Sequence, residues 1–402
     1  MHVKSVTVRN FRNYKESRLV LDPVRNVLIG ENAQGKTNLL EAIELVASGR
    51  SNRAASDREL ILRGADQALV EVAYSSAGIE ETVTLIITQG QRLSRKIKIN
   101  GATQSARERG GRLSRLTAVS FNCHDLNLLR GGPKYRRDWL DGLVTKLRPS
   151  FLSNILKYEK VVAQRNRLLK QFFERGRLVS ADLDELSVWD TQIAGYGALI
   201  IKARVEALNR ILPLAELNQS NISKRKEVLS ANYEFKQTDD DEDHFNVEES
   251  RTLSRVMGLG ELTALASGEL EAIILRSLKA RRGEEIARKQ TLTGPHRDDI
   301  SFALNDFSAV TFASQGQQRS LVLALKLAEL KIVEDVLEEP PLLLLDDVLA
   351  ELDLGRQGML MQLVNERMQT LITTTHLDGF RSEWLEGALV TKVESGSLVY
   401  NG

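Results

Sequence analysis

The chain has 402 residues, of which 42% are hydrophobic and 27% charged, a composition typical of globular proteins and long enough for two or three domains. No apolar run approaches the length of a membrane span, the first residues lack the apolar core of a signal peptide, and the single cysteine, Cys123, excludes an intrachain disulfide. We therefore expect a cytoplasmic protein. The net charge of +1 neither indicates nor excludes a nucleic-acid partner.

The first hundred residues are rich in strand signals. Short runs of alternating or apolar residues are separated by turn signals, and the last run ends at the turn pair Asn100-Gly101. Such a series predicts an antiparallel sheet with one solvated face. The predicted strands cover residues 3–8, 24–29, 68–74, 79–87 and 93–99.

A glycine-rich segment with the spacing G-x-x-x-x-G-K-T lies between the strand at 24–29 and a predicted helix at 37–43. This context is typical of a P-loop for ATP with Mg²⁺. Glycines let the backbone curl around phosphate, Lys36 would reach the β- and γ-phosphates, and the Thr37 hydroxyl would ligate the metal. The alternative is a strand-to-helix turn with a surface lysine. The segment consists of Gly30, Glu31, Asn32, Ala33, Gln34, Gly35, Lys36 and Thr37.

Helical spacing replaces the strand pattern at about residue 135. Residues 152–169 and 188–212 repeat apolar positions with helical spacing, and we expect 253–278 to continue this character. The acidic run 239–249 is typical of a solvated or disordered loop. We predict a helical lobe, lobe II, over 135–290, inserted into a lobe I made of 1–134 and 291–402.

Strand signals return after residue 291, with predicted strands at 300–304, 342–345 and 370–375 and a helix at 317–337. The leucine run 342–345 is typical of a strand buried on both faces. Two carboxylates follow it: we expect Asp346 to hold Mg²⁺ and Asp347 to orient or deprotonate the attacking water. The alternative is a strand that stops at a polar turn.

Four segments together resemble the ABC-type ATPase heads of the SMC family, in particular its bacterial recombination mediators: GENAQGKT at 30–37, FASQGQQRS at 312–320, LLLLDDVLAELD at 342–353 and TTTHLD at 373–378. Segments 8–14, 129–141 and 293–299 support the likeness. The resemblance implies an α/β ABC-type ATPase head, with a mixed sheet that carries the P-loop, an antiparallel β subdomain and an inserted helical lobe.

The resemblance also implies a shared active centre. Ser314, Gly316 and Gln317 match the signature motif, which contacts the γ-phosphate of ATP held by the other subunit of a homodimer. His376 matches the switch histidine, and Arg12 and Asn13 match a pair near the nucleotide. Leu352 and Asp353 match the D-loop at the dimer interface. The implied activity is a weak ATPase that acts as a conformational switch.

Two departures from the family pattern stand out. Asp347 replaces the glutamate of most ABC ATPases, and a shorter side chain should place the water less well, in keeping with slow hydrolysis. The segment 121–126, Phe-Asn-Cys-His-Asp-Leu, lacks the expected proline and glutamate, and no Q-loop glutamine can be assigned.

The basic segment 130–137 is a candidate for sequence-independent contact with DNA phosphates through Arg130, Lys134, Arg136 and Arg137. A solvated or internally neutralised face is the alternative. The resemblance implies double-stranded and single-stranded DNA as ligands, RecR and RecO as partners, and a role in helping RecA load at single-strand gaps. A transporter ATPase, a long-armed SMC or nuclease head, and a non-catalytic ATP-binding scaffold are the rival interpretations.

Overall fold

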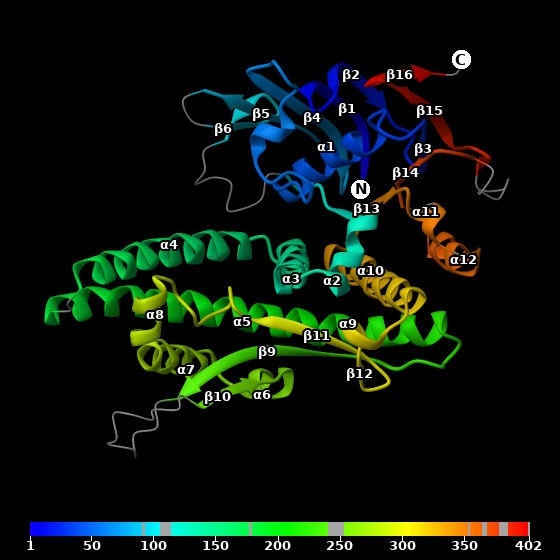
Figure 1. Cartoon of the computed structure of the whole chain (residues 1–402). Helices are drawn as coiled ribbons and strands as arrows, with labels where there is room; N and C mark the ends of the chain where they lie inside the picture. The colour runs from blue at the N-terminus through cyan, green and yellow to red at the C-terminus, as the bar shows by residue number, and fades with distance from the viewer. Residues whose placement is uncertain are drawn as a thin grey trace. The chain divides into compact units, whose positions relative to one another are not determined.

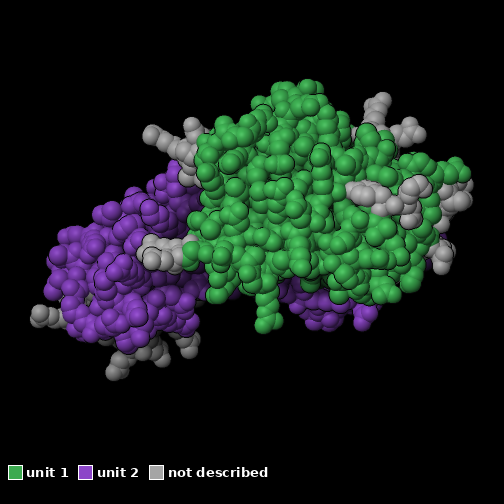
Figure 2. Space-filling model, turned by 90° about the horizontal axis from the view of Figure 1, so that it is seen from above, with its two compact units in different colours: residues 1–126, 221–223, 319–402 green, residues 127–220, 224–318 purple. Residues whose placement is uncertain are grey.

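In the computed structural model, the described residues are 1–90, 93–104, 114–176, 179–239, 253–352, 354–363, 368–377 and 385–400. They divide into two compact units: unit 1, with residues 1–126, 221–223 and 319–402, and unit 2, with 127–220 and 224–318 (Figure 2). These bounds differ from the predicted lobes, because residues 127–134 and 291–318 group with the helical unit. The reason is strand pairing, since β11 (Asp299–Leu304) pairs with β9 (Leu229–Asp239) of that unit.

Unit 1 contains a mixed sheet with the strand order β16-β15-β3-β14-β13-β8 (Figure 1). Its strands are β3 (Arg25–Ile29), β8 (Ala118–Phe121), β13 (Leu342–Asp346), β14 (Thr370–Thr374), β15 (Leu389–Glu394) and β16 (Ser397–Tyr400). All pairs are parallel except β15–β16. The four leucines of β13 are buried, as predicted for a strand covered on both faces. The carboxyl ends of β3, β14 and β13 therefore meet at one edge.

An antiparallel sheet makes up the rest of the β structure of unit 1, in the order β2-β1-β4-β5-β6-β7. Burial alternates along β4, so one face packs inward as predicted. Helix α1 (Lys36–Ser48) packs on strands of both sheets and shares one apolar core with them. The strands are β1 (His2–Phe11), β2 (Tyr14–Val20), β4 (Gln67–Ser76), β5 (Ile79–Gln89), β6 (Leu93–Ile99) and β7 (Ala102–Thr103).

Unit 2 is built on long helices. Helices α4 (Phe151–Arg175) and α5 (Ser180–Ile222) pack together through Leu169, Phe172 and Leu186, and buried Arg165 on α4 pairs with Asp190 on α5. The last residues of α5 belong to unit 1. The other helices are α2 (Asn127–Arg130), α3 (Pro133–Leu147), α6 (Leu259–Ala264), α7 (Ser267–Ala280), α8 (Arg282–Arg288) and α9 (Ala309–Phe312).

A four-stranded sheet in unit 2, with the order β10-β9-β11-β12, was not predicted. Strand β10 (Leu253–Met257) occupies part of the range expected to be helical, so that part of the prediction is wrong. Its residues are held by antiparallel pairing with β9, a partner that the local pattern does not reveal. The acidic run from residue 240 onward lies outside the described residues. Strand β12 covers Phe307–Ser308.

The remaining elements are one long helix and four shorter segments. Helix α10 (Gln315–Leu337) begins in unit 2 and continues into unit 1. The short elements of unit 1 are η1 (Asp57–Leu60), η2 (Cys123–Leu126), α11 (Val348–Glu351) and α12 (Leu354–Leu363). Among the helices described, none has the length and apolar composition needed to cross a membrane.

Candidate nucleotide site

The glycine-rich segment forms the connection between β3 and α1, as predicted. Gly35 has φ 117° and Ala33 has φ 65°, so the chain turns through left-handed backbone conformations. At Gly30 a Cβ would lie 2.4 Å from the carbonyl oxygen of Val393, which leaves no room for a side chain. Buried Lys36 extends its ammonium back along the loop and donates to the carbonyl oxygens of Gly30 (2.6 Å) and Glu31 (2.9 Å).

The residues expected to hold a metal ion meet at the edge of the sheet. The Thr37 hydroxyl donates to Asp346 Oδ1 at 2.8 Å, although the two residues are 309 positions apart. Thr373, at the end of β14, donates to the same oxygen at 2.8 Å and accepts from the Asp347 backbone N–H at 2.9 Å. A hydroxyl and a carboxylate at one point are hard oxygen ligands, the kind that Mg²⁺ takes beside phosphate. The residues present therefore fit the ion.

Asp347 lies one residue beyond Asp346, in a left-handed conformation with φ 53° at the start of α11. Burial and the adjacent Asp346 carboxylate raise the pKa of Asp347, and the Lys36 ammonium opposes them. A carboxylate with a raised pKa is a better proton acceptor than an ordinary aspartate. The Asp347 backbone is anchored by Thr373, so the direction of its side chain depends on β14.

The turn between β1 and β2 supports the loop from outside. Asn13 donates from Nδ2 to the Gln34 carbonyl (3.0 Å), and Asn38 donates to Asn13 Oδ1 (2.8 Å). The buried hydroxyl of Tyr14 donates to the Gly35 carbonyl at 3.0 Å. A Cβ at Gly35 would come within 2.9 Å of both Asn13 and Tyr14, so the fit requires glycine.

Arg12 lies at the same turn, but its side chain binds protein groups. Its Nε donates to Glu41 Oε2 at 2.8 Å and its Nη2 to Glu41 Oε1 at 2.6 Å, and Nη1 reaches the Glu59 carbonyl at 3.0 Å. Glu41 is buried on α1. The geometry therefore assigns Arg12 a role in fixing α1 against the turn, with direct contact to a nucleotide left as a prediction.

Two residues near the site were missed by the sequence reasoning. Asn122 and His124 line the same small pocket as Thr37 and Asp346. They follow β8, which is parallel to β13, so the ends of both strands lie at one edge of the sheet. Their position directly after an apolar strand was the available signal. The segment 121–126 lacks the proline and glutamate of the family pattern, so no role could be assigned to it.

The profile of the family described as RecF/RecN/SMC N terminal domain matches residues 2–396. A Synechococcus protein (strain JA-2-3B'a(2-13)) called "DNA replication and repair protein RecF" is 39% identical over 399 residues, which cover 99% of this chain and 97% of the relative. The Synechocystis protein of the same name is 41% identical over 99% of this chain and 98% of its own length. The chain belongs to the RecF family.

Solved structures agree with this membership. One described as "recombination mediator protein RecF-ATP in RecFOR pathway" superimposes with a TM-score of 0.84 at 29% identity, covering 100% of this chain and 98% of the other. A Pyrococcus furiosus Smc head domain superimposes with a TM-score of 0.51 at 13% identity, which shows the fold alone. The predicted RecF-like, ABC-type ATPase fold is thus confirmed.

The residues predicted to form the signature motif lie in unit 2, at the start of α10. Ser314 and Gln317 cap the helix reciprocally: the Ser314 N–H donates to Gln317 Oε1 (2.8 Å) and the Gln317 N–H to Ser314 Oγ (3.3 Å). Gln317 Nε2 also donates to Glu227 at 3.0 Å. Ser314 is exposed and Gly316 half-buried. A helix of 23 residues thus presents its positive end at an exposed serine.

His376, the predicted switch histidine, lies at the carboxyl end of β14. His376 is exposed beyond the end of β14, and its N–H and carbonyl both interact with the Thr374 hydroxyl, at 3.3 and 2.7 Å. This bracing holds the backbone next to the strand that anchors Asp347. Leu352, at the D-loop position, is half-buried, whereas Asp353 lies outside the described residues.

The basic segment is mostly occupied by internal contacts. The Arg136 side chain is 7% exposed and binds Asp299 through Nε (2.7 Å) and Nη2 (2.8 Å). Arg137 donates to the Asp298 carbonyl at 2.6 Å. The structure therefore contradicts an accessible phosphate contact by Arg136. Lys134 is exposed, and exposed Arg130 donates to Gln318 Oε1 at 2.9 Å.

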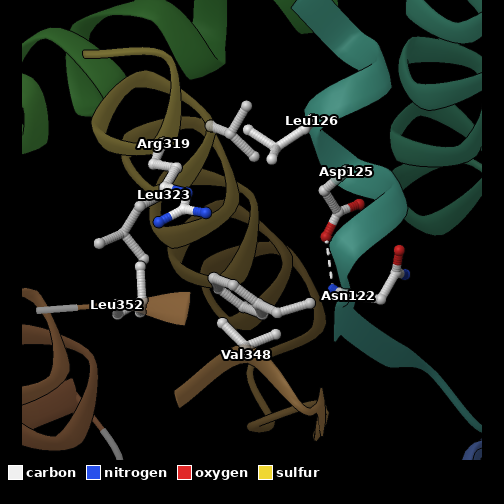
Figure 3. Close-up of a pocket in the computed structure, with 9 residues that line it drawn as sticks. Asn122, Asp125, Leu126, Arg319, Leu323, Val348 and Leu352 are labelled. Carbon is white, nitrogen blue, oxygen red and sulfur yellow. Dashed lines mark hydrogen bonds between the residues drawn. The ribbon is translucent and has the colours of Figure 1, made fainter. Parts of the chain in front are cut away.

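A separate cavity of about 40 Å³ lies in unit 1 between η2, α10 and α11 (Figure 3). Its walls are largely apolar, and a hydrogen bond from the Asn122 N–H to Asp125 Oδ2 (2.8 Å) closes one side. A volume of this size is far below that of a ligand pocket. It is a packing gap beside the Asp347 segment. Its lining residues are Phe121, Asn122, Asp125, Leu126, Arg319, Val322, Leu323, Val348 and Leu352.

Proposed function

We propose that the chain is an ATP-dependent DNA-binding protein of recombinational repair and replication. ATP drives head-to-tail dimerisation on DNA, and slow hydrolysis drives release. The observation that supports this most strongly is the meeting of Thr37 and Asp346 at 2.8 Å beside buried Lys36. The relatives named "DNA replication and repair protein RecF" supply the biological context.

Each part of the nucleotide site has a task in this proposal. When nucleotide binds, the Lys36 ammonium leaves the carbonyl oxygens of Gly30 and Glu31 and donates to phosphate oxygens. The new hydrogen bonds are stronger because both partners are charged. Thr37 and Asp346 would hold Mg²⁺, which would neutralise phosphate charge when bound. Asp347 orients the attacking water and accepts its proton, and His376 contacts the γ-phosphate. An aspartate at this position reaches less far than a glutamate, which accounts for slow turnover.

Dimerisation is the step that completes the site. Each chain carries one P-loop and one signature segment, so two chains related by a two-fold axis form two equivalent sites. Ser314 is exposed at a positive helix end, where it and backbone N–H groups of the signature segment bind the γ-phosphate of the partner's ATP. Loss of that phosphate removes contacts made only in the closed dimer.

DNA binding is proposed through phosphate contacts by Arg130 and Lys134, which remain exposed. Family membership supports binding of double-stranded DNA next to single-stranded DNA. On the same basis we propose that the chain works with RecR and RecO to help RecA load at single-strand gaps. A scaffold that binds ATP without hydrolysing it is the second candidate, and absence of turnover would favour it.

The decisive experiment measures the mass of the full chain by sedimentation with Mg²⁺ and either a non-hydrolysable ATP analogue or ADP. A dimer with the analogue and a monomer with ADP are expected. Lys36→Ala should abolish nucleotide binding, and Ser314→Arg should bind ATP normally but remain monomeric. An unchanged mass with both nucleotides rejects the switch, and a dimer of Ser314→Arg rejects the role of the signature segment.

A further inference from the structure

The hairpin turn between β15 and β16 touches the phosphate-binding loop from the far end of the chain. The turn consists of Ser395 and Gly396, with φ 48° and 74°. The Ser395 N–H donates to the Gln34 side-chain oxygen, and the Gly396 N–H donates to the Gln34 carbonyl at 2.9 Å. Ser395 and Gln34 are 361 positions apart in sequence, so the contact is purely tertiary.

The fit between the turn and the loop leaves no spare space. A Cβ at Gly396 would lie 2.5 Å from the Asn13 carbonyl oxygen, and Asn13 itself donates to the Gln34 carbonyl. The Ser17 hydroxyl donates to the Gly396 carbonyl at 3.2 Å. Just before the turn, the Val393 carbonyl oxygen lies so close to Gly30 that a Cβ there would be 2.4 Å away. The hairpin thus contacts both the beginning and the middle of the loop.

A phosphate-binding loop must direct its N–H groups toward the ligand, so its carbonyl groups need partners elsewhere. The Gln34 carbonyl has two such partners, one from each flanking turn. Its side chain is held by the hairpin at the same time. A loop fixed in this way loses less conformational entropy when it binds phosphate.

We propose that the β15–β16 turn is a positioning element of the nucleotide site and that Gln34 is a positioning residue, not a phosphate contact. The proposal rests on the proposed function, because it concerns the same nucleotide. It adds that the affinity for the diphosphate part depends on residues 395 and 396, outside every nucleotide-binding motif of the sequence. ADP suffices for the test, since it requires neither the γ-phosphate nor a second chain.

The chain supplies a matched control for this turn. The β4–β5 hairpin turn has the same geometry, with φ 49° at Ala77 and 77° at Gly78, but a Cβ at Gly78 would meet nothing within 4 Å. Gly396→Ala and Gly78→Ala therefore impose the same backbone strain in the same unit. Only Gly396→Ala also brings a Cβ within 2.5 Å of the Asn13 carbonyl oxygen, so the turn and Asn13 must move apart.

The experiment measures the dissociation constant of Mg·ADP for both variants by calorimetry, with circular dichroism as the check of folding. We expect Gly396→Ala to weaken binding about tenfold, the equivalent of one lost preorganising contact, and Gly78→Ala to bind like the wild type. Equal affinities of the two variants overturn the proposal. A wild-type chain that fails to bind ADP instead overturns the proposed function.

A second variant keeps the test independent of the folding of Gly396→Ala. Gln34→Leu removes the acceptor for the Ser395 N–H and leaves the hairpin backbone intact. We expect it to weaken ADP binding several-fold. The double variant with Gly396→Ala should bind no more weakly than Gly396→Ala alone, because displacing the turn already breaks the hydrogen bond that Gln34→Leu removes. Wild-type affinity in Gln34→Leu, or full additivity in the double variant, contradicts a shared role.

Discussion

Thr373 connects the two carboxylates of the candidate site, and its replacement by valine should slow hydrolysis without preventing nucleotide binding. Its hydroxyl donates to Asp346 and accepts from the Asp347 N–H, and the side chain is 1% exposed. Valine has nearly the same shape, so no cavity forms. What disappears is the hydrogen bond that anchors the Asp347 backbone.

The stability lost in Thr373→Val follows from the hydrogen bonds that Thr373 makes with Asp346 and Asp347. A hydrogen bond to a charged group contributes about 1.5–3 kcal/mol, and a buried N–H left without a partner costs about 1–3 kcal/mol. Asp346 keeps its bond from Thr37, so the lower part of each range applies. We expect Thr373→Val to lower the free energy of unfolding by about 2–4 kcal/mol. Thr373→Ser keeps the hydroxyl and should lose only about 1 kcal/mol for the methyl group.

Steady-state ATPase and calorimetric ADP binding distinguish this effect from general damage. Thr373→Val should reduce kcat at least about tenfold, a loss of about 1.4 kcal/mol in the transition state, with the dissociation constant for ADP changed little. Thr373→Ser should keep most of the turnover. If Thr373→Val hydrolyses ATP as fast as Thr373→Ser, the anchoring of Asp347 is irrelevant to catalysis and the reasoning is refuted.

Two predictions concern unit 2. Arg136→Ala should destabilise the chain by about 1.5–3 kcal/mol, because it removes the two charge-assisted hydrogen bonds to the partly exposed Asp299 carboxylate. Arg130→Ala should leave stability unchanged and reduce the salt slope of DNA affinity by about 0.9. Urea unfolding and DNA titrations check both, and the reverse pattern would restore Arg136 to the DNA surface. Burial and three nearby guanidinium groups lower the pKa of His296 from 6.5 to about 4. As the pH falls from 6.5 to 4, the unfolded chain therefore binds a proton at His296 that the folded chain does not bind. The wild type should lose up to about 3 kcal/mol of stability relative to His296→Gln over this range. Parallel curves of unfolding free energy against pH for the two proteins would contradict this.

Local patterns determined a large part of the fold and of the nucleotide site. The glycine spacing before Lys36 indicates the loop because glycine lets the backbone curl there, and the leucine run before Asp346 specifies a strand buried on both faces. The turn at Asn100-Gly101 follows from the same local chemistry, since both residues have positive φ. In each case the sequence signal lies within a few residues of the feature.

Tertiary structure alone decided the features that join distant segments. The hydroxyl of Thr373 and the turn at Ser395 gained their roles from strands that pair only in the folded chain, and β10 is a strand because β9 lies beside it. In the sequence, Arg136 cannot be told from a DNA-binding arginine, but the Asp299 carboxylate, 163 positions away, neutralises it. Hydrogen bonds and ion pairs over such distances depend on chain topology, which the composition and spacing of a segment do not encode.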